Sequence, residues 1–317
     1  MSENSPRRVS ADAIAAMTGR ALPLPALELS VGAALAGLGV SLCLHRVGET
    51  RRASDWQPGL CIPPSTLDDL VELLLSRRPG TSANWLSLSF DDGYRDAAEY
   101  VRTRAARFPA VEFFFFVCPQ KVERRAGFRW DLVERRLQGG VPRATALELL
   151  DAPHVIASEN ARDDLHGLAD EHDFAMVDLA EVRALAQMPN VIVGNHSTMH
   201  ASPRSLTNEV AEADYRTSRD DFERLIGPQK HFAFPFGTPR HHIEQRHVDV
   251  LRGLGDFMVW TTEARPYRLS ERRPGAVLPR FPIDGLKPAT ELAASIAARS
   301  VAFRLRGTKH DYGAASR

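Results

Sequence analysis

The sequence predicts an α/β fold in which parallel strands alternate with helices. Seven short apolar runs follow one another along the chain, and most are separated by stretches with helical periodicity. This succession is typical of either a parallel barrel or a doubly wound sheet. Polar signatures stand directly after the runs and not before them, which favours a barrel, because barrels carry their active sites at the C-terminal ends of the strands.

The composition and charge exclude several classes of protein. The chain has 317 residues, 44% of them hydrophobic, and its formal net charge is zero. Such a chain can bury a large core, and an α/β barrel routinely uses ~200–250 residues as one domain. A neutral chain has no overall attraction for nucleic acid or an anionic membrane. We therefore expect no nucleic-acid partner.

Cysteine usage and the N-terminal region favour a cytoplasmic protein. Cys43, Cys61 and Cys118 are widely spaced and form no CxxC pair, which argues against a disulfide framework. The apolar run at 29–44 is shorter than the ~20 residues that span a membrane, and no cleavage site stands out. We expect cytoplasmic localisation, with a membrane-associated N-terminal helix as the less favoured alternative.

Each element is predicted from its own pattern. The strands are expected at Val40–Leu44, Trp85–Phe90, Val111–Val117, Val191–Val193, His231–Phe234, Phe257–Thr261 and Val277–Ile283. Ser65 and Asp68 resemble a capping box at the start of the first helix after the arm. Further helices are expected at 95–107, from Asp178 to before Pro189, at 207–226, at about 241–253 and from Pro288.

Three segments lie outside this repeating pattern. Residues 1–39 are interpreted as an N-terminal arm and 301–317 as a C-terminal tail, on either side of a barrel at 40–300. The stretch 119–180 is charged, rich in arginine and helix-like, and it is interpreted as an insertion between the third and fourth βα units.

Asp91-Asp92-Gly93 follows the second predicted strand. Taken alone, it is more typical of a turn than of a site, because Asp and Gly are common turn residues. The functional interpretation needs two adjacent carboxylates with different tasks. At an extended strand end, neighbouring side chains point in opposite directions. One carboxylate can then face a metal while the other faces the water that attacks.

His196 and His200 follow the fourth predicted strand. Two histidines four residues apart can decorate a surface helix, or they can bind a metal from one side of a helical turn. Two imidazoles and one carboxylate leave a coordination position open, which is typical of a catalytic site. The two motifs together, each at a strand end, favour such a site.

At these motifs the sequence resembles the polysaccharide deacetylases, the nodulation-type chitooligosaccharide deacetylase homology group of metal-dependent carbohydrate esterases. Ser89-Phe90-Asp91-Asp92-Gly93 matches the family's first motif and His196-Ser197-Thr198-Met199-His200 its second. Phe234-Pro235-Phe236-Gly237 looks like the third. The resemblance covers about residues 40–300, and it implies a distorted (β/α)7 TIM-like barrel with a helical insertion.

The resemblance also implies a role for each matching residue. Asp91 would be the general base, and Asp92, His196 and His200 would be the ligands of a divalent metal. Zinc is the expected ion, with cobalt or nickel as substitutes. The third motif, at Pro235 and Phe236, would line the substrate site, and the backbone N–H of Phe236 would help to hold the oxyanion.

The sequence departs from the commonest family pattern at two places. Ala233 and Phe234 stand where the third motif usually has an arginine, and the last strand has Arg280 but no histidine. A subset of the family has an early leucine-histidine strand end, here at His45, and a late leucine-x-arginine. We therefore expect His45 to be the general acid, across the metal from Asp91, and Arg280 to orient Asp91. The alternatives are a backbone-bonded histidine and a plain salt bridge.

Two tryptophans are weaker candidates. Trp260 ends the sixth predicted strand, near where the family has an apolar patch for the acetyl methyl, but a strand tryptophan is more often core packing. Trp130 lies in the insertion, where it would either stack on a sugar ring or hold the insertion against the barrel.

The leading functional hypothesis is a metal-dependent hydrolase that removes acetyl from an N-acetylated sugar of a glycan or glycoconjugate. One alternative keeps the site and changes the bond, to an O-acetyl ester or a non-sugar amide. Another is a barrel that has lost catalysis and binds a glycan or a partner, which the two departures from the family pattern keep open.

Overall fold

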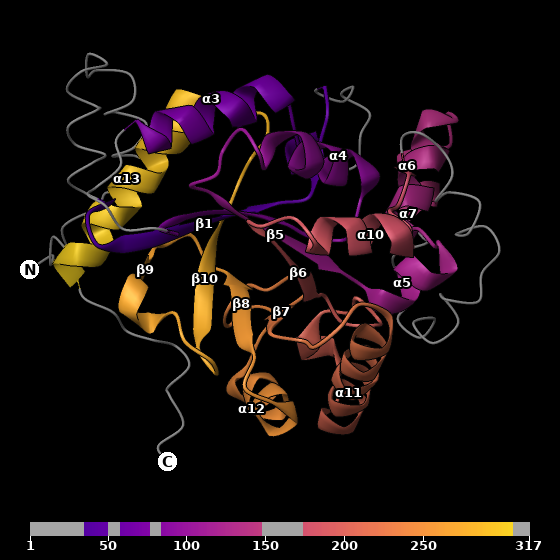
Figure 1. Cartoon of the computed structure of the whole chain (residues 1–317). Helices are drawn as coiled ribbons and strands as arrows, with labels where there is room; N and C mark the ends of the chain where they lie inside the picture. The colour runs from indigo at the N-terminus through magenta and orange to yellow at the C-terminus, as the bar shows by residue number, and fades with distance from the viewer. Residues whose placement is uncertain (1–34, 50–57, 77–83, 148–173, 307–317) are drawn as a thin grey trace, which may run out of the picture.

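A closed barrel of parallel strands organises the computed structural model, which describes residues 35–49, 58–76, 84–147 and 174–306 (Figure 1). Its strands, in barrel order, are β1 (Leu38–Leu44), β4 (Leu86–Phe90), β5 (Glu112–Val117), β6 (Val191–Asn195), β7 (His231–Ala233), β8 (Met258–Thr262) and β10 (Val277–Pro282). All neighbours pair in parallel, and β10 pairs with β1 to close the ring. The predicted seven-stranded barrel is confirmed.

Short strands extend this barrel at its rim. β9 (Tyr267–Arg268) pairs antiparallel with the start of β1. Directly after β1, β2 (Arg46–Val47) pairs with β3 (Cys61–Ile62).

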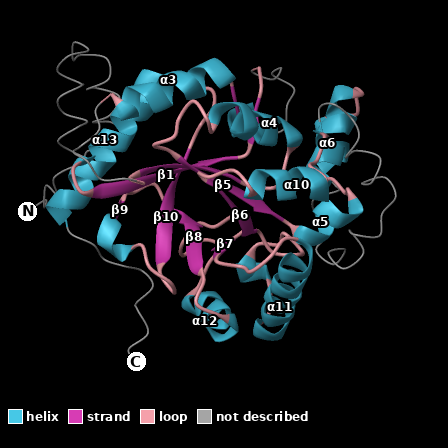
Figure 2. Cartoon of the chain, viewed as in Figure 1, coloured by secondary structure: helices cyan, strands magenta, loops and turns pink. Residues whose placement is uncertain are grey.

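Helices surround the strands (Figure 2). They are α3 (Pro64–Leu75), α4 (Arg95–Arg104), α5 (Pro119–Arg124), α6 (Arg129–Gln138), α7 (Arg143–Leu147), α10 (Leu179–Ala186), α11 (Asn208–Leu225), α12 (Gln245–Leu254) and α13 (Ala289–Arg306). α13 packs against α3 on the outside of the barrel (Figure 1). Among the residues with a described position, no helix is long and apolar enough to cross a membrane.

The four consecutive phenylalanines of β5 show how the barrel is filled. Because side chains alternate along a strand, Phe113 and Phe115 join the core beneath the helices, whereas Phe114 and Phe116 point into the barrel. There the Phe114 ring lies 4.8 Å from that of Trp260, which comes from the non-adjacent strand β8. Gly194 gives Phe116 room, because an added Cβ at this glycine would lie 2.3 Å from the ring.

Capping differs between two of the helices. At the predicted helix start at Asp178, Asp178 and Glu181 form a reciprocal capping box for α10, which the sequence prediction did not name. The box at Ser65 is wrong: α3 begins at Pro64, whose fixed φ suits the first helical turn, and no side chain caps it. Asp68 instead accepts a 2.9 Å hydrogen bond from the Tyr100 hydroxyl and binds two arginines, which ties α3 to α4.

The segments outside the repeating pattern are described in part. α5, α6 and α7 belong to the predicted insertion at 119–180, of which 148–173 lie outside the described residues. Most of the predicted arm, 1–34, and the tail beyond Arg306 also lie outside them. Residues 38–44 of the apolar N-terminal run form strand β1 and not a helix. The predicted domain boundaries stay a prediction.

Candidate active site

The Asp91-Asp92-Gly93 segment is a tight turn that directly continues β4. Asp91 still pairs with the neighbouring strand through its N–H, 2.9 Å from the Leu44 carbonyl oxygen. Asp92 and Gly93 then take left-handed conformations, with φ of 76° and 90°. The prediction that an extended strand end separates the two carboxylates is therefore wrong. The left-handed turn separates the two carboxylates. Its second left-handed position favours glycine, here Gly93, because glycine has no Cβ.

Asp91 is held by Arg280 inside the mouth of the barrel. The guanidinium donates two hydrogen bonds, Nη1 to Oδ1 at 2.6 Å and Nη2 to Oδ2 at 2.9 Å. The Cys43 thiol lies 3.6 Å from Oδ2 as a third donor. Burial raises the pKa of Asp91, but Arg280 and His196 outweigh it, and the pKa is lower than usual. The predicted contact between Arg280 and Asp91 is present, and it keeps Asp91 ionised.

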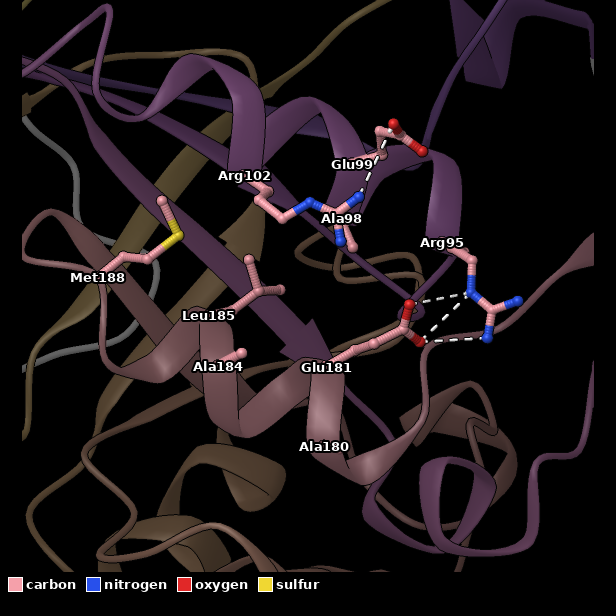
Figure 3. A pocket seen from close by; sticks show the side chains of 9 residues that line it. All are labelled: Arg95, Ala98, Glu99, Arg102, Ala180, Glu181, Ala184, Leu185 and Met188. Carbon is pink, nitrogen blue, oxygen red and sulfur yellow. Dashed lines mark hydrogen bonds and ion pairs between the residues drawn. The ribbon is translucent and has the colours of Figure 1, made fainter.

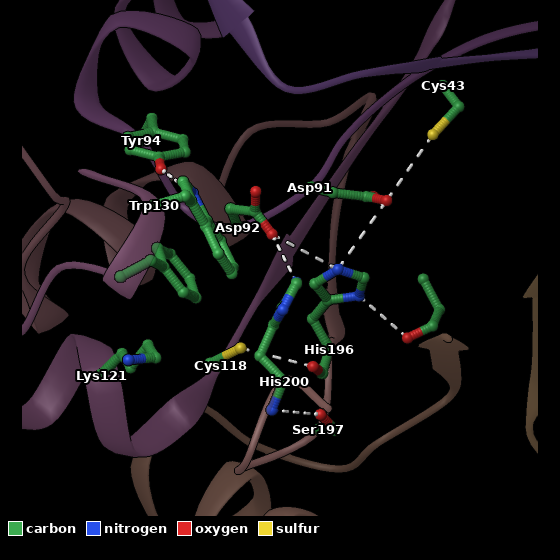
Figure 4. A network of polar contacts seen from close by, with 12 residues as sticks. Cys43, Asp91, Asp92, Tyr94, Cys118, Lys121, Trp130, His196, Ser197 and His200 are labelled. Carbon is green, nitrogen blue, oxygen red and sulfur yellow. Dashed lines mark hydrogen bonds and ion pairs between the residues drawn. The ribbon is translucent and has the colours of Figure 1, made fainter. Parts of the chain in front are cut away.

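The loop that carries the two histidines is not a helical turn, so that prediction is wrong. Ser197 and His200 have φ of 66° and 48°, which folds the loop sharply after β6. The Ser197 N–H donates to Asn195 Oδ1 at 2.9 Å, and the His200 N–H donates to Ser197 Oγ at 3.1 Å. This fold turns both imidazoles toward Asp92 (Figure 4).

Asp214 of α11 also holds this loop, and the sequence prediction missed it. Its Oδ1 accepts the N–H groups of Thr198 at 3.1 Å and Met199 at 2.8 Å. Burial raises the pKa of Asp214 to about 6, although the two backbone hydrogen bonds oppose that rise. In the sequence it is one acidic residue of a polar helix. Its only signal is that it shares a helical face with the apolar Ala211 and Tyr215.

Asp92, His196 and His200 form a cluster that fits a divalent cation. Their ligand atoms lie within 4.8 Å of one another, and Asp92 Oδ1 is 2.8 Å from His200 Nε2 and 3.5 Å from His196 Nε2. That buried oxygen accepts no well-aligned hydrogen bond from the described residues. His196 Nδ1 lies 2.9 Å from the Ala233 carbonyl oxygen, which can only accept, so the proton is on Nδ1 and the Nε2 lone pair faces the cluster.

The protonation states favour the same assignment. Burial raises the pKa of Asp92, but His200 and His196 together bring it well below its usual value. Burial lowers the pKa of His200, which Asp92 opposes only in part. The cluster therefore presents an ionised carboxylate and a neutral imidazole, the forms in which these groups bind metals.

His45 lies beside Asp91 and not across the cluster of Asp92, His196 and His200 from it. A ring nitrogen of His45, an Asp91 carboxylate oxygen and the Cys43 sulfur lie within 4.8 Å of one another. The cause is the barrel register: Leu44 pairs with Phe90, so the residues that follow β1 and β4 are neighbours. His45 is half-buried, whereas Asp91 is buried.

The third motif forms the edge of the site after β7. Phe236 has a φ of 56°, is 50% exposed, and its ring lies 5.4 Å from that of His200. Pro235 precedes it, and Gly237 leaves room for Thr262, whose Oγ1 would lie 2.9 Å from an added Cβ. The role of the Phe236 N–H in holding an oxyanion stays a prediction.

Comparison with known proteins identifies the family. A model of the polysaccharide deacetylase family matches residues 78–255, which is more than half of the chain. The chain belongs to the polysaccharide deacetylase family. No curated protein sequence matches it.

Solved structures of deacetylases have a similar fold. A polysaccharide deacetylase of Bacillus cereus is 14% identical, with a TM-score of 0.53 over 81% of this chain and 68% of its own. A deacetylase of Streptococcus pyogenes, solved in complex with acetate, is 12% identical, with a TM-score of 0.51 over 82% and 98%. A de-N-acetylase of Aggregatibacter actinomycetemcomitans is 13% identical, with a TM-score of 0.51 over 82% and 100%.

The insertion of this family member adds aromatic side chains beside the cluster of Asp92, His196 and His200. Trp130 stacks on Phe128 with ring centroids 4.3 Å apart, and it lies 4.8 Å from the His200 ring. Its indole N–H donates to the Tyr94 hydroxyl at 2.8 Å, and that hydroxyl donates to Asp131 at 2.7 Å. Trp130 therefore borders the site and also fixes α6 to the barrel. Tyr94 and Asp131 were missed, because neither belongs to a motif.

Trp260 does not line the site. Its side chain is fully buried in the barrel, near Phe114 and Tyr267, and its indole N–H donates to His231 Nδ1 at 3.2 Å. The predicted contact of Trp260 with the acetyl methyl is therefore wrong. The side chain of this β8 residue points to the apolar interior, where it packs in the core.

A hollow on the outside of the barrel is not the site. It lies between α4 and α10, has a volume of about 330 Å³, and is bordered by the ion pair of Arg95 with Glu181 (Figure 3). None of the predicted site residues lines it.

Proposed function

We propose that this polysaccharide deacetylase family member is a divalent-cation-dependent hydrolase that removes acetyl from an N-acetylated sugar of a glycan or glycoconjugate. One observation carries the proposal. The Asp92, His196 and His200 cluster lies next to an ionised carboxylate, Asp91, that a buried arginine holds on both oxygens.

Asp92, His196 and His200 would hold the cation. One carboxylate and two imidazoles leave a position free for substrate or water, and zinc suits this donor set, with cobalt or nickel as substitutes. When bound, a divalent cation polarises the substrate carbonyl and lowers the pKa of water. The loop hydrogen bonds and the Ala233 carbonyl orient the imidazoles before the cation binds.

Asp91 would accept the proton of the attacking water. Its lowered pKa leaves it unprotonated at neutral pH, and the two hydrogen bonds from Arg280 fix its plane. Oδ2 lies 3.8 Å from His196 Nε2, so the base borders the cation cluster. The N–H of Phe236 would donate to the oxyanion.

His45 would protonate the leaving amine nitrogen. Its position beside Asp91 means that proton acceptor and proton donor stand next to each other, on adjacent strand ends. A de-N-acetylase and an acetate-bound deacetylase among the similar structures support an N-acetyl substrate and acetate as product.

Acetate release tests the proposal. Protein reconstituted with zinc should release acetate from N-acetylglucosamine oligomers, and Asp91→Asn should lower the rate by ~10²–10⁴-fold, the usual contribution of a general base. Asp249→Asn is the matched control, because its side chain is 57% exposed on α12. Turnover of O-acetylated substrates alone would make the chain an esterase, and no turnover by metal-loaded protein would indicate a barrel without catalysis.

A second substrate tests His45 separately. His45→Gln should slow hydrolysis of the N-acetyl amide, whose amine must be protonated to leave, by ~10²-fold or more. It should leave hydrolysis of an aryl acetate nearly unchanged, because a phenolate leaves without a proton. Equal losses on both substrates would remove His45 from the role of acid.

A further inference from the structure

A second group of metal-type donors stands directly against the first. Cys43, His45 and Asp91 each offer one ligand atom, and these atoms lie within 4.8 Å of one another. Asp91 lies between the Cys43 thiol and the His196 ring, so the two donor groups adjoin (Figure 4). The proposed deacetylation uses Asp91 and His45, and it leaves the thiol without a task.

The three donors are arranged as a site and do not merely lie near one another. Cys43 and Asp91 are 2% and 3% exposed, and the sulfur points at Oδ2 from 3.6 Å. Arg280 donates one hydrogen bond to Oδ2, and the Cys43 sulfur approaches the same oxygen, which has a second lone pair to offer a cation. His45 is half-buried, so the third donor is partly exposed to solvent. A cation that replaced the thiol proton would meet sulfur, oxygen and nitrogen donors from two adjacent strand ends.

We propose that Cys43, His45 and Asp91 form a second, inhibitory cation site that takes soft or borderline divalent ions such as Zn²⁺ or Cd²⁺. The thiol proton is released to solvent as the sulfur–metal bond forms, so charge and atoms balance. Thiolate and imidazole donors select these ions over Mg²⁺. An ion there occupies the groups proposed as base and acid, and hydrolysis stops. The inhibition rests on the proposed function, whereas the binding does not.

Cadmium titration of the metal-free full chain separates the two sites. The wild type should bind about two equivalents of Cd²⁺, one of which gives thiolate-to-cadmium ultraviolet absorption, since only the second site contains sulfur. Cys43→Ser should bind about one equivalent without that absorption. Cys61→Ser is the matched control, a buried thiol near the Gly48 and Glu49 carbonyl oxygens, and should behave as the wild type.

Two more variants keep the test decisive. Asp92→Ala should lose the first equivalent and keep the thiolate absorption. His45→Gln should keep the thiolate absorption but weaken the affinity for Cd²⁺ by at least about tenfold. Mutation of a residue that only hydrogen-bonds a metal ligand already lowers metal affinity by ~10–100-fold, and His45 is proposed as a ligand itself. Excess Zn²⁺ should inhibit hydrolysis of the acetylated substrate, and the same concentration of Mg²⁺ should not. Cys43→Ser should raise the half-inhibiting Zn²⁺ concentration by more than about tenfold.

The outcomes distinguish this proposal from the proposed function. One equivalent without thiolate absorption, in an active enzyme that excess Zn²⁺ does not inhibit, overturns the second site and leaves the function standing. Thiolate absorption that survives Asp92→Ala, together with a metal-loaded wild type that has no hydrolytic activity, supports the second site and overturns the function. The same thiolate absorption in Cys43→Ser as in the wild type places the sulfur ligand elsewhere and overturns the second site.

Discussion

The mouth and the floor of the barrel each contain a buried histidine, and the two differ in everything else. At the mouth, where the strands end, His196 faces the carboxylates of Asp91 and Asp92. At the floor, where β7 begins, His231 accepts the Trp260 N–H and packs against Phe114. Burial, with smaller effects of Arg272 and Lys230, lowers the pKa of His231 to about 3. The floor histidine is a neutral core residue.

The same contrast holds for two pairs of an arginine with a carboxylate. At the mouth Arg280 pairs with Asp91, with side chains 0% and 4% exposed. At the floor Arg272 pairs with Glu112, with side chains 15% and 12% exposed. Both pairs join an arginine to a carboxylate, but they lie at opposite ends of the barrel and differ in burial. Active-site residues lie at the C-terminal ends of the strands, because the loops that follow the strands there can direct side chains into the site.

The largest expected difference between the two ends is in stability. Arg280→Met leaves the Asp91 carboxylate buried without a cation, and it should lower the free energy of unfolding by about 3–5 kcal/mol. Arg272→Met leaves Glu112 within reach of water and should cost only about 1–2 kcal/mol. Urea unfolding measures both.

A double variant identifies the cause of this loss. Arg280→Met combined with Asp91→Asn should recover most of it, because no uncompensated charge is left buried. Equal losses in the two arginine variants would mean that the mouth pair is no more deeply desolvated than the floor pair.

Metal affinity should separate the two histidines. His196→Gln removes a proposed ligand and should weaken zinc binding by more than about 100-fold, since even outer partners of ligands are worth ~10–100-fold. His231→Gln should leave the affinity within about twofold, because distant sites act independently. Calorimetric titration of metal-free protein with Zn²⁺ compares them. A comparable loss in both variants would break the distinction between mouth and floor.

Substitution of Trp260 tests whether this residue belongs to the core at the floor or to the substrate site. Trp260→Phe removes the hydrogen bond to His231 and part of the packing against Phe114, and should lower the free energy of unfolding by about 1–2 kcal/mol. Because the indole is fully buried in the core, zinc affinity and the Michaelis constant for an N-acetylated substrate should not change. A raised Michaelis constant at unchanged stability would return Trp260 to the substrate site.

The sequence predicted the barrel and the site motifs because both depend on local patterns. The strand ends at His45, Asp91 and His196 follow from apolar runs that stop at a polar residue. Arg280 beside Asp91 followed from the family resemblance, and the closure of β10 on β1 is what brings the two together.

What the sequence did not predict depends on backbone geometry or on distant packing. The left-handed conformations of Asp92, Ser197 and His200 replace the expected strand end and helical turn, and no local propensity demands them at non-glycine residues. The placement of His45 beside Asp91 depends on strand register, which periodicity alone does not determine. Asp214 reaches the histidine loop only after α11 packs against the barrel.

The smallest expected effect is a pH dependence of stability that comes from Asp214. This carboxylate lies at the mouth, but burial shifts its pKa toward the neutral form, as burial does for His231 at the floor. Its pKa is raised to about 6, so the folded state binds a proton that the unfolded state has lost between about pH 4 and 6. Its contribution to stability should therefore fall as pH rises through that window, by at most about 1.4 kcal/mol per pH unit. Asp91 and Asp92, whose pKa values are lowered, change stability only at lower pH.

Asp214→Asn isolates this contribution, because the amide oxygen can still accept the N–H groups of Thr198 and Met199. The difference in unfolding free energy, wild type minus variant, should decrease from pH 4 to pH 6 and stay flat above it. Asp131, whose pKa is also raised to about 6, is present in both proteins and cancels. A difference that does not vary with pH would mean that Asp214 is ionised throughout. The N–H groups of the histidine loop would then donate to an ionised Asp214 carboxylate over the whole range measured.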